Sequence, residues 1–184
     1  MPYGIRKYNK LNKYNRFPIK YGCEACGYEG KLYRHGFYYR NLITFNKAYR
    51  VVIIRYRCKS CHKTYSLIPS FIIPYRQYTY HVILTCLIIM FKFNYSFSKI
   101  IKFVNSINCM LSINKTHLSF WKSRLITSLT AIRLFFAQLK IFCPDTKNVF
   151  PSNLLTMITD FSRLRYDFNL RFFLDMPKYF FCKP

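Results

Sequence analysis

The sequence predicts an α+β fold, in which a small N-terminal antiparallel β-ribbon is followed by an all-α region. Two cysteine pairs, in CEACG at 23–27 and CKSCH at 58–62, bracket a segment that reads as strands. After the segment IPSFIIPYRQYT the hydrophobic period changes from about two to about 3.6 residues. Pro69 and Pro74 lie at this change and mark the expected boundary between the two parts.

The N-terminal part can be divided further. Residues 1–20 form a basic arm without a clear hydrophobic period, and residues 21–74 form the ribbon. Its strands are predicted within KLYRHGFYYR, RVVIIRYR and KTYSLI, because these segments are rich in aromatic and β-branched residues. Residues 41–48, NLITFNKA, are expected to form the loop between the first two strands. The arm is expected either to lie on a phosphate backbone or to be a solvated terminus.

A helical, helix-turn-helix-like region is predicted over residues 75–142, followed by a C-terminal helix and an aromatic tail at 143–184. Thr79 and Ser96 are suitable N-caps for the first two helices. A long linker, NSINCMLSIN, leads to a third helix that begins near Asn114. The sequence Cys-Pro after this helix is expected to end it, because proline cannot continue a helix.

The charge balance restricts the class of partner. The chain has 30 Lys and Arg against 6 Asp and Glu, which gives a formal net charge of +24. An AT-rich genome supplies Lys, Asn, Ile, Phe and Tyr in abundance. Codon bias does not explain why Glu, which also has A-rich codons, occurs only at positions 24 and 29. The charge therefore indicates a polyanionic partner, and nucleic acid is favoured over an acidic membrane surface.

The sequence has no segment typical of a secretory signal or a membrane span. The N-terminal residues lack a continuous apolar region. The longest apolar run, 82–91, is interrupted by Thr85 and followed by Lys92, whereas a span needs about 18 apolar residues. The protein is therefore expected to be soluble and cytoplasmic. In a reducing compartment cysteines rarely form disulfides, which favours metal binding by the paired cysteines.

The two cysteine pairs carry the strongest functional signal. Two residues separate Cys23 from Cys26, and two residues separate Cys58 from Cys61. Two such turns can direct four thiolates at one cation, which predicts a structural Zn²⁺ and a zinc ribbon. A redox CxxC motif is the alternative, and the two histidines of the ribbon are expected at the surface. Four sulfur ligands leave no open position for water, so catalysis by the metal is not expected.

The motifs of residues 20–80 resemble a bacterial zinc-ribbon plus helix-turn-helix family associated with insertion-sequence transposases and transposase-like proteins. The shared features are the CxxCG motif, the GFYYR segment, and the RYRCKSC motif that runs into SLIPSFIIPYR. In the region that follows, the order of helices is similar and ends in a Thr-x-x-x-x-Trp element. The resemblance implies zinc binding by the four paired cysteines and recognition of DNA by the third helix.

On this resemblance, the helix from Lys115 to Leu125 is the reading helix. One side of it, with Leu118, Trp121 and Leu125, would pack on the two preceding helices. The opposite side would contact bases and phosphates, and its residues are Lys115, Thr116, Ser119, Lys122, Ser123 and Arg124. The residues alone leave an alternative open, in which the Trp121 side is simply core and the opposite side is solvated.

The sequence does not predict an enzyme. Two-metal cleavage of DNA needs three carboxylates brought together by a sizeable domain. The acids after the ribbon lie within a short C-terminal stretch and are Asp145, Asp160, Asp167 and Asp175. No phosphate-binding loop, HExxH motif or GxSxG motif occurs in the chain. A binding function is therefore favoured over catalysis.

The favoured hypothesis is a zinc-ribbon protein of a mobile element that binds double-stranded DNA, transposase-like but without a catalytic domain. It predicts a homodimer through the apolar helix at 125–142. The protein would be either an accessory subunit that works with a separate transposase subunit or a transposase remnant. Basic residues around the second cysteine pair are predicted to contact phosphate as well: Arg55, Arg57, Lys59 and Lys63. A zinc-ribbon RNA-binding or ribosome-associated protein is the alternative, favoured by the aromatic and basic residues of YRHGFYYR. A third hypothesis is a membrane-surface or partner-binding protein in which zinc is only structural.

Overall fold

The computed structural model describes residues 4–139 and 151–163 and divides the chain into two compact units. Unit 1 comprises the residues up to Leu42 and those from Ala48 to Pro69. Unit 2 comprises the short segment Ile43–Lys47 and the residues from Ser70 onward. Within the described residues there are three strands and five α-helices, so the predicted α+β class is confirmed.

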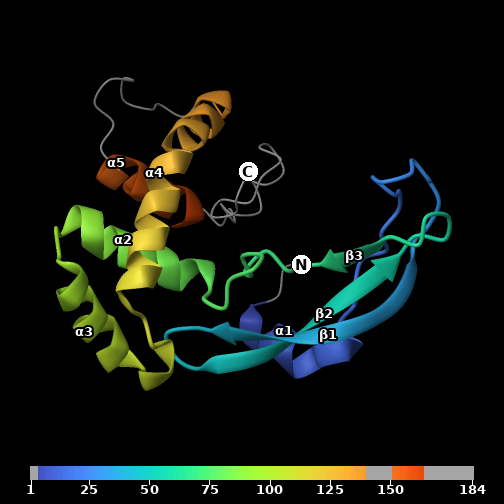
Figure 1. The fold of residues 1–184 in the computed structure, drawn as a ribbon, viewed down its shortest axis with the longest axis horizontal. Coiled ribbons are helices and arrows are strands. Elements are labelled where there is room, and N and C mark those ends of the chain that lie inside the picture. The colour runs from blue at the N-terminus through green and yellow to red at the C-terminus, as the bar shows by residue number, and fades with distance from the viewer. Residues whose placement is uncertain (1–3, 140–150, 164–184) are drawn as a thin grey trace. The chain divides into compact units, whose positions relative to one another are not determined.

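Unit 1 is built on a sheet with the strand order β1-β2-β3. The strands are β1 (Tyr33–Ile43), β2 (Ala48–Arg57) and β3 (Thr64–Leu67). Strands β1 and β2 run in opposite directions and form a long ribbon (Figure 1). Strand β3 pairs antiparallel with β2, with Tyr65 opposite Tyr56. The central strand β2 has a run of consecutive buried side chains at 51–54, which means that both of its faces are covered.

The turn between β1 and β2 is shorter than the sequence predicts. A loop is expected over 41–48, whereas β1 continues through Ile43 and β2 begins at Ala48. The Thr44 hydroxyl donates to the Lys47 carbonyl at 2.8 Å and accepts the backbone N–H groups of Asn46 and Lys47, each at 3.2 Å. Because one hydroxyl satisfies three backbone groups, it can close a tight turn that hydrophobic patterning does not reveal.

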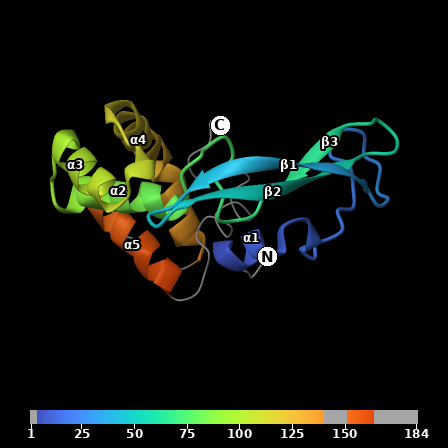
Figure 2. The ribbon, with the colours of Figure 1, turned by 90° about the horizontal axis from the view of Figure 1, so that it is seen from below.

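The basic arm contains a short helix that the sequence does not predict. Helix α1 (Ile5–Leu11) packs against β2 (Figure 2). Tyr8 is the one buried side chain of this helix, and its hydroxyl donates to the Val52 carbonyl at 2.7 Å. Burial raises the pKa of Tyr8 to about 12. A helix with a single buried residue has no detectable hydrophobic period, which is why the sequence pattern misses it.

Unit 2 is helical, and its core forms where α2 contacts α3, α4 and α5. Its helices are α2 (Tyr80–Lys92), α3 (Phe97–Ile107), α4 (Lys115–Gln138) and α5 (Pro151–Arg163). Figure 1 shows α4 crossing α2. Leu87 of α2, Val104 of α3 and Trp121 of α4 are all buried in this core.

Side-chain caps define two of the helix starts. The Ser96 hydroxyl accepts the Lys99 N–H at 3.4 Å, whereas Thr79 precedes α2 without making a side-chain cap. At α4, Asn114 accepts the His117 N–H at 3.0 Å, and Nδ1 of His117 accepts the Asn114 N–H at 3.3 Å. This reciprocal arrangement is a capping box in which His117 takes the position more often held by Glu or Gln.

The connection between α3 and α4 is more compact than the sequence predicts. A linker is expected from Asn105 to Ile113, whereas α3 continues through Ile107 and a 3-10 turn follows at Cys109–Leu111. The Asn105 side chain donates to the Ile113 carbonyl at 3.0 Å and accepts the Ile113 N–H at 2.9 Å. The Tyr78 hydroxyl donates to the Leu111 carbonyl at 2.6 Å. These bonds hold the start of α4 close to the end of α3.

The C-terminal helix predicted within 143–184 is α5, which extends from Pro151 to Arg163. Helix α4 runs without interruption to Gln138, and the helix end expected at Cys143-Pro144 lies outside the described residues, as does the aromatic tail after residue 163. Across 4–139 and 151–163, no helix combines the length and apolar character needed to cross a bilayer.

Candidate functional site

The four paired cysteines come together in unit 1 as one cluster, and their sulfurs all lie within 4.8 Å of one another. Cys23 Sγ lies 3.5 Å from Cys61 Sγ, and Cys26 Sγ lies 3.7 Å from Cys58 Sγ. Each of these contacts joins a cysteine of the first pair to a cysteine of the second. The ribbon therefore returns the second pair to the first, as the sequence predicts.

The sulfur spacing fits a tetrahedral metal ion. A disulfide would bring two sulfurs to about 2.05 Å, and all four cysteines are free. Four thiolates at about 2.3 Å from a central ion lie about 3.8 Å apart in a regular tetrahedron. The separations of 3.5 and 3.7 Å are close to that value, so the cluster can hold a metal ion.

The two cysteine turns share one backbone design. The Cys23 N–H donates to the Tyr28 carbonyl at 2.7 Å, and the Cys58 N–H donates to the Lys63 carbonyl at 2.9 Å. The residue after each second cysteine has a left-handed backbone, with φ of 71° at Gly27 and 60° at His62. Glycine adopts this conformation without steric cost, and histidine does so more often than most residues. His62 is thus explained by the turn, and its side chain is exposed.

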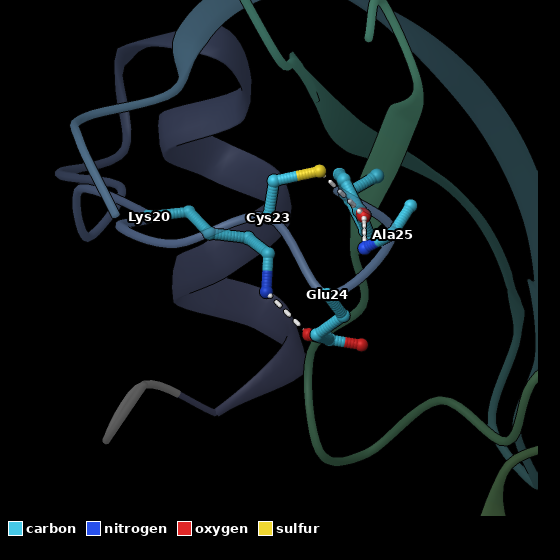
Figure 3. A network of polar contacts seen from close by, with 5 residues as sticks. Lys20, Cys23, Glu24 and Ala25 are labelled. Carbon is cyan, nitrogen blue, oxygen red and sulfur yellow. Dashed lines mark hydrogen bonds and ion pairs between the residues drawn. The ribbon is translucent and has the colours of Figure 1, made fainter. Parts of the chain in front are cut away.

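Tyr65 on β3 contacts the cluster, and no sequence motif marks it. Its hydroxyl accepts the Ala25 N–H at 3.2 Å and lies 3.1 Å from Cys23 Sγ, which leaves its own proton for the sulfur. Figure 3 shows Cys23 and Ala25 at this network. The hydrogen bond to Tyr65 lowers the pKa of Cys23 to about 6, and the same bond raises the pKa of Tyr65 to about 12. Tyr65 therefore stabilises the thiolate form of Cys23.

A backbone hydrogen bond from Tyr28 lowers the pKa of Cys26 as well, whereas Cys61 does not share this preference. The Lys63 N–H lowers the pKa of Cys61, but desolvation and hydrogen bonds with the other cysteines outweigh it and raise this pKa to about 11. Four neighbouring thiols cannot all ionise without a cation, because each thiolate disfavours the next. A metal ion supplies the missing positive charge and releases the remaining protons as it binds. Metal affinity is therefore expected to fall as the pH falls.

Replacing Tyr65 by Phe is expected to weaken metal binding by about 10- to 100-fold, as loss of an outer hydrogen bond to a ligand does in other metal sites. The ring stays in place, so the change removes only the hydroxyl. The measurement is competition for the metal with a chelating dye. Tyr21→Phe is the matched control, because Tyr21 is 63% exposed and is not a member of the cluster. Equal affinities for Tyr65→Phe and the control would contradict the role given to this hydroxyl.

The surroundings of the cluster are basic. Lys20 Nζ lies 3.0 Å from a Glu24 carboxylate oxygen (Figure 3) and 5.0 Å from the centre of the Tyr65 ring. Glu24 is largely exposed, so this ion pair contributes little to stability. Its effect is to hold the Lys20 side chain over Tyr65.

The four basic residues predicted to contact phosphate differ in exposure. Lys59 and Lys63 are exposed, whereas Arg55 and Arg57 are partly buried on β2. Arg57 Nε donates to the His62 carbonyl at 3.1 Å, so this arginine also supports the second cysteine turn. The two lysines are therefore the more accessible members of the set.

Helix α4 has a buried side and an exposed polar side. Leu118, Trp121 and Leu125 are buried in the core of unit 2. Arg124 is partly buried, with its guanidinium 5.2 Å from the centre of the Phe120 ring, and Arg76 lies 4.0 Å from the same ring. The other residues predicted to contact DNA are exposed, namely Lys115, Thr116, Ser119, Lys122 and Ser123. Arg76 is a basic residue beside this helix that the sequence does not single out.

Comparison with known families gives one result. Residues 23–94 match a domain of unknown function, DUF6431. The DUF6431 match begins at the first cysteine of the cluster and ends two residues after α2. It therefore includes all four cysteines but not α3 or α4. No curated protein and no solved structure shows significant similarity to the chain.

Proposed function

We propose that this protein binds double-stranded DNA, with a structural Zn²⁺ in the four-cysteine cluster and α4 as the helix that reads the major groove. The observation that carries the proposal is the exposed side of α4. Lys115, Thr116, Ser119, Lys122 and Ser123 are exposed on a helix whose opposite side is anchored by buried residues. A helix held in this way can present side chains to a groove without losing its packing.

Charge supports a nucleic acid as the partner. The chain has no Asp or Glu between Gly30 and Pro144, a stretch that includes β1 to β3 and α2 to α4. A solvated helix surface ordinarily carries both signs of charge, whereas a phosphate-binding surface excludes carboxylates. On α4 the lysines would contact phosphates, while the hydroxyls of Thr116, Ser119 and Ser123 would contact base edges.

The arrangement of α2, α3 and α4 supports a helix-turn-helix-like reader. Four residues connect α2 to α3, and the longer connection to α4 is drawn in by Asn105 and Tyr78. The residues just before α4, Leu111 and Ile113, are thereby held by two side chains from outside the helix. A fixed helix start matters because the first turns of a recognition helix contact the bases.

The donor set supports zinc as the metal. Four thiolates at tetrahedral spacing favour Zn²⁺ over the harder cations, which prefer oxygen ligands. Such a closed site stabilises the fold and does not catalyse a reaction. The role in a mobile element, beside a separate transposase, rests on the resemblance of the motifs at residues 20–80.

The function can be tested with a labelled DNA duplex selected from a random pool and a salt series. Lys122→Gln is expected to weaken binding at all sequences and to reduce the slope of log K against log salt by about 0.9, because one phosphate contact is lost. Ser119→Ala is expected to relax sequence preference, with a smaller effect on the slope.

Lys102→Gln on α3 is the matched control, since Lys102 is exposed and the change in charge is the same. Lys102→Gln should give the same slope of log K against log salt as the wild-type protein. If Lys102→Gln and Lys122→Gln lower affinity equally, the effect is one of net charge and α4 is not the reading helix. Tighter binding to hairpin RNA than to any duplex would favour the RNA-binding alternative.

A further inference from the structure

Strand β1 carries a row of aromatic side chains on the surface of unit 1. Tyr33, Phe37, Tyr38 and Tyr39 are between 36% and 41% exposed. Side chains alternate along a strand, so the rings at odd positions share one face. Two edge-to-face pairs show this, Tyr33 with His35 at 6.1 Å and Phe37 with Tyr39 at 5.6 Å between ring centres. Clusters of exposed rings of this kind mark interaction surfaces.

The charge around these rings is positive and has no internal counter-charge. The Arg50 guanidinium lies 4.8 Å from the centre of the Tyr39 ring. Arg50 is exposed and forms no ion pair within the described residues. The occupant of this surface therefore needs flat apolar faces for the rings and negative charge for Arg50.

We infer that the aromatic face of β1 binds single-stranded nucleic acid by stacking bases on its rings, with Arg50 on a phosphate. A duplex does not fit this surface, because its base faces are already stacked inside the helix. An acidic protein segment supplies charge but few flat faces. Single strands supply both, and strand surfaces with exposed aromatic residues recognise them in this way.

The spacing along β1 agrees with this occupant. The two ring pairs are centred four residues apart, which is about 13 Å along a strand. A stacked strand of nucleic acid rises about 3.4 Å per nucleotide, so about four nucleotides span that distance. Within each pair the planes are nearly perpendicular, at 90° and 81°, so one ring can present its face while the other supports it. The two ring pairs therefore provide two stacking positions for a stretch of about four nucleotides.

This surface is independent of the duplex-binding face proposed on α4, because it consists of unit 1 residues alone. A protein with both surfaces could hold a duplex and a neighbouring unpaired strand. A substitution that abolishes binding at one surface should leave binding at the other unchanged, so the two surfaces can be tested separately.

The experiment uses the full chain with its metal and a fluorescein-labelled oligothymidylate of about fifteen nucleotides, with an oligouridylate of equal length as the RNA arm. Phe37→Ala is expected to weaken binding of the single strand by about tenfold or more, since stacking on one ring is worth that much. Phe37→Tyr keeps the ring and should restore the affinity. Neither variant should change duplex affinity. Binding of both oligonucleotides, or of one alone, supports the inference and identifies the sugar that is preferred.

Phe103→Ala on α3 is the matched control, because Phe103 is an exposed ring in unit 2. Unchanged single-strand affinity for Phe37→Ala, or an equal loss for Phe103→Ala, would overturn the inference. Photo-crosslinking of the wild-type protein to an iodouracil-containing strand provides a measurement without any substitution. Crosslinks within residues 33–39 support a stacking surface on β1, and crosslinks found only elsewhere refute it.

Discussion

Cys58→Ser is expected to abolish metal binding and to unfold the cysteine turns while unit 2 stays folded. Cys58 is fully buried and lies 3.7 Å from Cys26 Sγ, so a serine oxygen would face three thiols without being a good ligand for a soft-site metal. Binding free energies of structural zinc sites are on the order of 10 kcal/mol, which is comparable to the whole stability of a small domain. In the first turn Glu24, Ala25 and Cys26 are all exposed, so burial of these side chains contributes little to its order.

Two measurements separate the units. Metal content by mass spectrometry of the native protein should fall from one ion to none, and amide exchange should become fast in both cysteine turns and β3. Trp121 is the only tryptophan of the chain and lies in the core of unit 2, so its fluorescence reports on that unit. Its unfolding transition should stay at the wild-type midpoint.

Cys109→Ser is the matched control for Cys58→Ser, because Cys109 is an exposed free cysteine in unit 2. It should retain one metal ion per chain. Full metal occupancy in Cys58→Ser would show that the cluster is not the metal site. Loss of metal without a change in amide exchange would show that the sheet alone orders the turns.

The metal cluster could be predicted from sequence because its geometry is local. Two residues between cysteines fix the direction of each sulfur pair, and a strand ribbon between the pairs is enough to bring them together. The support from Tyr65 could not be predicted, since it depends on the register that places β3 beside the first turn. Ala25 and Tyr65 are 40 residues apart, and nothing in the chain near either residue marks their contact.

The helices of unit 2 also combine features that could be predicted from the sequence with features that could not. The Ser96 cap, the start of the third helix near Asn114 and the buried side of α4 could be predicted, whereas Thr79, an equally suitable cap residue, makes no side-chain cap. The extent of the α3–α4 connection could not, because Asn105 usually favours the end of a helix. Here its side chain instead satisfies both backbone groups of Ile113 from within the helix. Long-range pairing overrides local propensity at this position.

Trp121→Ala is expected to lower the free energy of unfolding of unit 2 by about 3–5 kcal/mol, the usual cost of removing a large buried ring. Trp121 is 2% exposed, stacks on His117 at 5.8 Å between ring centres, and meets Tyr78 edge-to-face at 5.4 Å. These rings join three features at the start of α4, namely its capping box, the Tyr78 hydrogen bond to Leu111, and the core. The substitution should therefore also weaken duplex binding, because the exposed side of α4 would lose its fixed position.

Denaturant unfolding followed by far-ultraviolet circular dichroism measures this loss, since the substitution removes the fluorescent probe and the long helices belong to unit 2. Ile126→Ala on the same helix is the matched control, because Ile126 is 47% exposed and should change stability by about 0.5 kcal/mol or less. Trp121→Phe retains an aromatic contact to Tyr78 and should lose less than the alanine variant. If Trp121→Ala and Ile126→Ala are equally stable, α4 is not anchored through Trp121, and a reading helix held by its buried side loses its structural basis.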